Sequence, residues 1–140
     1  MAKERKGLDP ANYAKAGTEH AHQVALFMWA ASPDVSARFP ELKLMFAIPN
    51  GGERNKIVAS RLKAEGVKSG VPDVFLPVQR HGIAGLFIEM KRPKSEGMAK
   101  GRASDTQSEW ATKLRAEGYG ACVCEGWDKA RDVIILYLSK

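Results

Sequence analysis

The chain has 140 residues, 44% of them hydrophobic and 27% charged, which is typical of one globular domain and not of a disordered or fibrous protein. Its 22 lysines and arginines outnumber its 16 acidic residues, and the net charge of +6 favours a polyanionic partner. The N-terminus lacks the apolar stretch of a signal peptide, and no apolar run is long enough to span a bilayer. We therefore expect a soluble cytoplasmic protein that does not bind a membrane.

The first half of the chain predicts an arm, two helices and one strand. Residues 1–16 are polar and basic and predict a loose N-terminal arm, and residues 17–140 then form a single domain. Thr18 is a suitable N-cap for a helix that Pro33 ends. Residues 44–48 predict a strand, which the turn Pro49-Asn50-Gly51-Gly52 closes, and residues 53–65 predict a second helix, which Gly66 stops.

The second half predicts a hairpin, a helix, a strand and a closing helix. Two apolar strands, 73–78 and 85–91, are joined through His81-Gly82, which favours a β-hairpin. A Gly- and Lys-rich segment follows, and Ser104 to Gln107 then match a capping box at the start of a helix. The last strand and helix are expected at residues 120–124 and 127–138. This order predicts an α/β fold with a central mixed sheet flanked by helices.

The only cysteines, Cys122 and Cys124, lie two residues apart on a predicted strand and share a face. A disulfide across so short a span would be strained, so we expect two reduced core residues. They do not form a zinc site, because the three histidines are distant in sequence and no second cysteine pair exists.

The strand 85–91 carries the most informative pattern. Because strand side chains alternate between faces, Phe87, Glu89 and Lys91 point to one side. Buried charges are costly unless they are paired or bind a metal, so an acid and a base on one face of an apolar strand indicate a site. An ordinary ion pair at the strand end is the alternative explanation.

Asp73 opens the other strand of the hairpin, directly after Gly70-Val71-Pro72. Adjacent strands lie about 4.8 Å apart, so the hairpin can place Asp73 beside Glu89. Two carboxylates at that distance repel each other, and one pKa rises unless a cation lies between them. A divalent metal such as Mg²⁺ would satisfy both groups. Taken alone, Asp73 could equally be a turn residue after Pro72.

Pro72-Asp73 followed by Glu89-x-Lys91 resembles the PD-(D/E)xK nuclease motif, a short pattern that often arises by chance. The flanking residues are similar to the VRR-NUC branch of that superfamily, from about Glu19 to the C-terminus. They comprise Ile48 to Gly52, Leu62 to Gly66, Gly70 to Asp73, Phe87 to Pro93, and Ser104 to Gln107 with Trp110. The resemblance implies a restriction-endonuclease-like fold.

The resemblance also implies roles for particular residues in a DNA endonuclease that uses Mg²⁺ or Mn²⁺. Asp73, Glu89 and the backbone carbonyl of Met90 would be metal ligands. Lys91 would orient or activate the attacking water, or stabilise charge on the phosphate. Gln107 matches the family's helix glutamine, and Glu19 matches an acid on the first helix that would bind the metal through water.

Two of these assignments have competing explanations. Gln107 also fits the reciprocal capping-box bond to Ser104, and we do not expect one side chain to fill both roles completely. Glu19 could be a solvated acid that the helix dipole favours in the first turn.

The resemblance implies branched DNA as substrate and a homodimer as the active form. Stand-alone members of the family, found in phages and bacteria, resemble Holliday junction resolvases, which act as symmetric dimers. The expected location is thus the cytoplasm of a bacterium or of a phage-infected cell. The alternatives are a nuclease acting on flaps, nicked duplex or single strands, and a basic DNA-binding module without catalysis.

Cations in two regions are expected to contact the DNA backbone and make binding salt-dependent, with a solvated basic surface as the alternative. Asn50 is expected to bring backbone close to a phosphate, unless its glycine-rich segment is an ordinary turn. The expected cations are Arg54 and Lys56 in the second helix, and Arg92, Lys94, Lys100 and Arg102 after the strand that carries Lys91.

Overall fold

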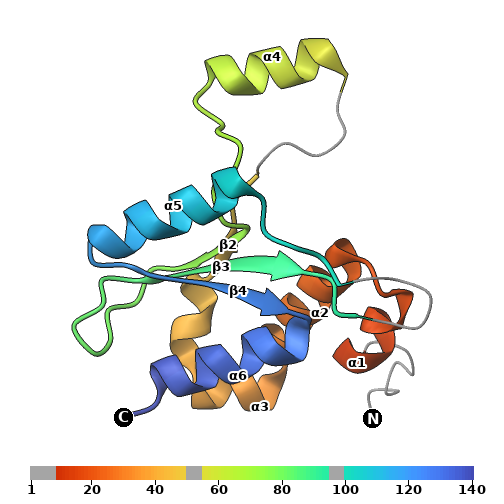
Figure 1. Cartoon of the computed structure of the whole chain (residues 1–140). Coiled ribbons are helices and arrows are strands. Elements are labelled where there is room, and N and C mark those ends of the chain that lie inside the picture. Colours follow the sequence, from red (N-terminus) through yellow and green to blue (C-terminus); the bar gives the residue numbers. More distant parts are fainter. Residues whose placement is uncertain (1–8, 50–54, 95–99) are drawn as a thin grey trace.

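A computed structural model describes residues 9–49, 55–94 and 100–140 (Figure 1). Its helices are α1 (Pro10–Tyr13), α2 (Glu19–Ala31), α3 (Pro33–Arg38), α4 (Lys56–Ala64), α5 (Asp105–Ala116) and α6 (Trp127–Leu138). Its strands are β1 (Phe46–Ala47), β2 (Val74–Leu76), β3 (Leu86–Lys91) and β4 (Gly120–Glu125). Two short 3₁₀ helices, Ala14–Ala16 and Pro40–Leu44, complete the secondary structure.

The four strands form one mixed sheet in the order β1-β2-β3-β4. Strand β2 runs antiparallel to both β1 and β3, and β4 runs parallel to β3. Phe75 lies opposite Phe87 in the β2–β3 pair, which confirms the predicted hairpin. The α/β prediction of a mixed sheet flanked by helices is also confirmed (Figure 1).

One face of the sheet forms the hydrophobic core. Val74, Leu76 and Ile88 are completely buried there, and α2 and α6 pack against them with Leu26 and Ile134. Their alternation along β2 and β3 gives the two-residue period of a strand with one buried face. Burial of this face fixes the strand register, because a shift by one residue would expose every core side chain.

The opposite face carries aromatic side chains and then the charged residues. The Phe75 and Phe87 rings stack with their centroids 4.1 Å apart, and Tyr119 meets Phe87 edge-on at 5.4 Å. Helix α5 lies on this side of the sheet (Figure 1). Since side chains alternate along β3, Glu89 and Lys91 continue the face of Phe87 towards the strand's C-terminal end.

The structure differs from the sequence prediction around the first strand. The predicted strand 44–48 is reduced to Phe46–Ala47, because the 3₁₀ helix Pro40–Leu44 turns Leu42 and Met45 into the core first. Helix α4 starts at Lys56 after an Asn55 cap, whose side chain accepts from the Val58 amide at 2.9 Å. Asn50 and Arg54 lie outside the described residues, so their predicted contacts with DNA stay predictions.

The N-terminal region is helical from Pro10 to Ala16, at the end of the predicted arm, and α1 packs near α2 (Figure 1). The proposed boundary at residues 16 and 17 stays a prediction. Within residues 9–49, 55–94 and 100–140, no helix combines the length and apolar composition needed to cross a bilayer.

Candidate active site

The hairpin brings Asp73 to the C-terminal half of β3. One carboxylate oxygen of Asp73, Oδ2, accepts a hydrogen bond from the backbone amide of Met90 at 2.7 Å. The carbonyl of Asp73 accepts from the Ile48 amide at 2.8 Å. Asp73 is therefore held between the segment after β1 and the strand that carries Glu89, as the sequence predicted from the hairpin.

Glu89 is the most perturbed acid of the site and is only 4% exposed. Its Oε1 accepts from Gln107 Nε2 at 2.5 Å and lies 3.4 Å from Lys91 Nζ. Its Oε2 is buried and has no hydrogen-bond partner among the described residues. Burial and the neighbouring Asp73 carboxylate raise the pKa of Glu89 to about 8, although Lys91 acts in the opposite direction.

The buried oxygen of Glu89 tests whether the residues present fit a divalent cation. A buried carboxylate oxygen without a donor costs free energy unless a proton or a cation compensates it. The Asp73 carboxylate and the Met90 backbone lie beside it, which supplies the hard oxygen ligands that Mg²⁺ and Mn²⁺ prefer. The donor set therefore fits such a cation.

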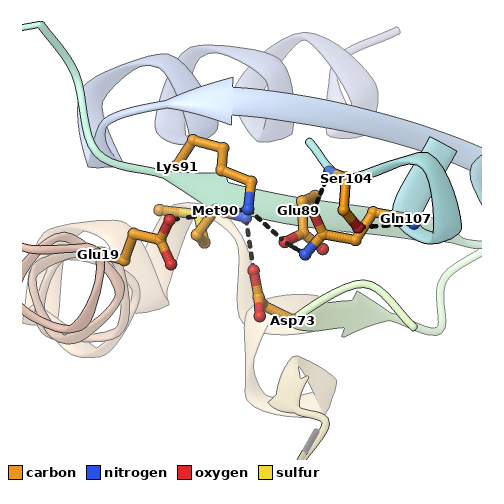
Figure 2. Close-up of polar contacts among 7 residues, drawn as sticks. All are labelled: Glu19, Asp73, Glu89, Met90, Lys91, Ser104 and Gln107. Atoms are coloured by element: carbon orange, nitrogen blue, oxygen red, sulfur yellow. Dashed lines mark hydrogen bonds and ion pairs between the residues drawn. The ribbon is translucent and has the colours of Figure 1, made fainter. Parts of the chain in front are cut away.

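Lys91 lies between two carboxylates from different elements (Figure 2). Its ammonium is 3.4 Å from Glu89 Oε1 and 3.7 Å from Glu19 Oε1, and the residue is only 7% exposed. The Lys91 carbonyl accepts from the Gly126 amide at 2.9 Å, which holds the end of β3 against the end of β4. A buried ammonium in this position is a fixed positive charge at the edge of the site.

Glu19 is the first residue of α2 and is exposed. Thr18 caps the helix by accepting from the Ala21 amide at 3.0 Å, as predicted. The described residues contain no group of three or more carboxylate, histidine or cysteine side chains close enough to share a metal. Glu19 is thus placed to neutralise Lys91, and an inner-sphere role is not indicated.

Gln107 fills the two roles that we did not expect one side chain to combine. Its Oε1 accepts from the Ser104 amide at 2.8 Å, while its Nε2 donates to Glu89 (Figure 2). Ser104 Oγ in turn accepts from the backbone amide of Gln107, so both bonds of the capping box are present. That expectation was wrong because the side-chain amide of Gln107 has an acceptor oxygen and a donor nitrogen that point in different directions.

The loop after β3 returns to the site. The Gly101 amide donates to the Arg92 carbonyl at 3.0 Å, so the described ends of this loop meet beside Lys91. Lys94, Lys100 and Arg102 are exposed there, and Lys100 pairs with Glu125 at 3.4 Å.

Lys56 does not lie on the loop beside Lys91 but is the first residue of α4. Helix α4 projects away from the sheet and has no buried residue (Figure 1). The structure therefore gathers only one of the two predicted basic regions at the site.

The two cysteines are free, with their sulfur atoms 3.8 Å apart. Cys124 is buried and Cys122 is half-buried, on the strand beside β3. The hydrogen bond with the neighbouring Cys122 thiol, together with burial, raises the pKa of Cys124 and keeps it a thiol. This matches the prediction of a reduced pair within the fold.

Sequence analysis missed the contacts of one buried histidine. His22 is 7% exposed, and its Nδ1 accepts from the Trp127 amide at 3.0 Å, which joins α2 to the start of α6. Burial lowers the pKa of His22. No local pattern marks this contact, because His22 and Trp127 lie 105 residues apart in the chain.

Comparison with known proteins agrees with this geometry. The family profile of the VRR-NUC domain matches residues 17–128. The chain belongs to the VRR-NUC family. A solved structure described as a VRR_NUC domain protein superposes with a TM-score of 0.69 and 29% sequence identity, over 86% of this chain and 88% of that one. No curated protein matches. The VRR-NUC domain has a PD-(D/E)xK-like fold and makes this chain a nuclease-type protein that processes DNA.

Proposed function

We propose that this VRR-NUC protein is a metal-dependent, structure-selective DNA endonuclease that acts like a Holliday junction resolvase. The observation that carries the proposal is the buried Glu89 carboxylate, one oxygen of which has no partner among the described residues, next to Asp73 and 3.4 Å from the Lys91 ammonium. Perturbed acids beside a fixed cation are characteristic of hydrolytic sites. Family membership supports DNA as the substrate.

The cofactor in this proposal is Mg²⁺ or Mn²⁺. Asp73, Glu89 and the Met90 carbonyl would hold it, with Glu19 acting through water. When bound, such a cation polarises a phosphoryl oxygen and lowers the pKa of water.

The other side chains of the site position Glu89, stabilise negative charge and bind the DNA backbone. In this proposal the Lys91 ammonium, 3.4 Å from Glu89 Oε1, would stabilise the negative charge that the phosphodiester gains in the transition state. Gln107 holds Glu89 Oε1, so that Oε2 would be available to bind the cation. Lys94, Lys100 and Arg102 would bind the backbone of the DNA on either side of the cut.

Resolution of a four-way junction requires two opposed cuts. A chain with one site of this kind needs a second copy to make both, and a two-fold dimer is the commonest oligomer. We therefore propose a homodimer. Sedimentation with and without junction DNA measures the number of copies, and a single copy in the complex would contradict it.

Cleavage of a panel of labelled DNAs tests the function. Wild-type protein is incubated with a four-way junction, a flap, a nicked duplex and a single strand in Mg²⁺, in Mn²⁺ or in EDTA. We expect cleavage only with the metals and fastest on the junction. Preference for flaps would overturn the resolvase assignment and keep the nuclease, whereas DNA binding in EDTA without cleavage in either metal would identify a binding module.

Variants of the site provide the matched test. Asp73→Ala and Glu89→Ala should abolish cleavage while circular dichroism shows a retained fold, and Lys91→Met should lower the rate by about 10²–10³-fold. Lys129→Met replaces an exposed lysine of α6 and should not change the rate. Full cleavage by purified Glu89→Ala protein would refute the assignment.

A further inference from the structure

A hollow of about 720 Å³ opens directly beside the candidate metal ligands. Glu19, Asp73 and Met90 form its wall on the side of the site. Its volume lies within the range of about 300–1,000 Å³ that is usual for pockets binding small organic groups. The remaining wall is mostly apolar and consists of Gln23, Val24, Phe27, Met28, Ala31 and Ala47, with His20 at the polar end.

Helix α2 supplies most of this wall through an apolar stripe that the described residues cover only in part. Ala25, Leu26 and Trp29 face the core and are buried. Val24, Phe27 and Met28 follow one another at helical spacing on a neighbouring stripe and are only half-buried. Phe27 packs against the core on one side and borders the hollow on the other, so this stripe of α2 serves both the fold and the hollow.

The polarity of the hollow changes along its length. It starts at the acidic residues of the site and continues along α2 to Ala31, a rise of about 18 Å from Glu19. Gln23 can donate and accept hydrogen bonds near the polar end. Phe27 and Met28 offer an aromatic ring and a polarisable thioether farther along.

This arrangement matches the chemistry of one nucleotide. A nucleotide joins a charged phosphate to a flat, largely apolar base whose edge carries hydrogen-bonding groups. With the phosphate at Asp73 and Glu89, an unstacked base of the same strand can reach the hollow without crossing another element, because Asp73 and Met90 border both. Aromatic side chains that stack on bases are a general device of single-strand recognition.

We infer that the hollow along α2 binds an unpaired nucleobase next to the scissile phosphate and so selects DNA whose bases are unstacked at the cut. The inference rests on the proposed function and adds the source of its structural selectivity. In paired duplex the base stays in the stack, because unstacking costs a few kilocalories per mole, and the hollow then contributes nothing. At a branch point bases are already unstacked, so binding in the hollow does not require that free energy.

Filling the hollow from its far end tests the inference. Ala31 and Ala116 are both exposed alanines at the last position of their helices, but only Ala31 borders the hollow. Cleavage rates are measured for wild type, Ala31→Trp, Phe27→Ala and Ala116→Trp on two DNAs that differ only in whether the bases at the cut are paired. Ala31→Trp and Phe27→Ala should slow cleavage of the unpaired DNA by about tenfold or more and leave paired DNA unchanged. Ala116→Trp should behave as wild type.

Photocrosslinking gives a readout that does not need cleavage. A 5-iodouracil next to the cut site is irradiated in complex with Glu89→Gln protein, and the crosslinked peptide is identified by mass spectrometry. We expect attachment within residues 23–31, lost when Ala31→Trp is added and kept with Ala116→Trp.

The outcomes separate this inference from the proposed function. If wild type cleaves DNA, and Ala31→Trp and Ala116→Trp cleave unpaired DNA at equal rates, the hollow does not bind a nucleobase. The proposed nuclease function would then remain. A change of sedimenting mass in Ala31→Trp, without a change of substrate ratio, would identify a contact between copies and refute the inference. If wild type cleaves no DNA in either metal, both the proposed function and this inference are refuted.

Discussion

The carboxylate of Glu89 lies in surroundings that favour its protonated form in the absence of a cation. It is 4% exposed, and burial together with Asp73 outweighs the attraction of Lys91, so its pKa reaches about 8. The same surroundings favour a divalent cation, which replaces the proton. Binding of Mg²⁺ or Mn²⁺ and proton release should therefore be coupled.

This coupling predicts how stability depends on pH in EDTA. Between the ordinary pKa of 4.5 and about 8, the folded protein holds a Glu89 proton that the unfolded chain has lost. The contribution to the free energy of unfolding is fully present below pH 4.5 and is lost as pH rises through 8, at most about 1.4 kcal/mol per pH unit. Urea unfolding at several pH values measures it. Glu89→Gln does not titrate, so identical slopes for wild type and this variant would contradict the raised pKa.

Gln107 offers a second prediction, because its Oε1 caps α5 and its Nε2 binds Glu89. Gln107→Glu keeps an acceptor for the Ser104 amide, as capping boxes allow, but places a second carboxylate against Glu89. We expect a stable α5 and a cleavage rate lowered by about 10–100-fold. Gln107→Ala should lose both the reciprocal bond to the Ser104 amide and the contact that positions Glu89, while Ser104 Oγ still caps the Gln107 backbone amide. Thermal unfolding and single-turnover rates separate the two effects, and unchanged cleavage by Gln107→Glu would remove Gln107 from the site.

At the scale of elements, the loop before β2 and helix α5 bring Asp73 and Gln107 to the same place. Gly70 makes this possible, because it has φ +89° and no side chain where the loop meets α5. A Cβ there would lie 2.5 Å from Thr106 Cγ2 and 2.8 Å from Trp110 Cδ1. Neither atom belongs to a flexible side chain, so the loop or the helix would have to move.

Gly70→Ala should therefore destabilise the protein and displace the site. Gly66→Ala is the matched control, since Gly66 also has positive φ, +99°, but nothing lies within 4 Å of its Cβ position. We expect a cost of about 1–2 kcal/mol for the backbone in both variants and a further 1–3 kcal/mol for overpacking in Gly70→Ala alone. Denaturant unfolding measures the difference, and equal losses in the two variants would show that the close approach is unimportant.

The elements themselves were largely predictable. The Ser104 cap, the hairpin and helix α6 follow from patterns within a few residues of each other, and all three are present as predicted. The strand predicted at residues 44–48 is present but shortened to Phe46–Ala47, because the 3₁₀ helix Pro40–Leu44 holds Leu42 and Met45 in the core. Tertiary packing outweighs local strand propensity in such short segments.

At the scale of the whole molecule, the net charge of +6 is distributed unevenly with respect to the site. Lys94, Lys100 and Arg102 lie on the loop that returns beside Lys91, whereas α4 and its cations project from the body (Figure 1). We therefore expect the cations of the loop, and not those of α4, to contact the phosphate backbone at the cut.

Salt dependence of binding tests the loop. Each phosphate contact contributes about 0.9 to the slope of log affinity against log salt, so the change of Lys94, Lys100 and Arg102 to alanine together should reduce the slope by roughly three. The same change of Lys43, Lys113 and Lys129, which are exposed on other elements, is the control. An unchanged slope in the loop variant would show that these cations do not bind the backbone.

The sequence by itself determined the fold class, the hairpin, most helix ends and the family, because each depends on periodicity, caps and short motifs that neighbouring residues carry. It also placed Asp73 beside Glu89, since strand pairing follows from the turn between them. Only the tertiary structure decided that one buried Glu89 oxygen has no partner within the part of the chain that it describes, that Gln107 bonds two groups, and that α2 lines a hollow beside the site. These features depend on burial and on distances between elements far apart in the chain, and local patterns carry no measure of either.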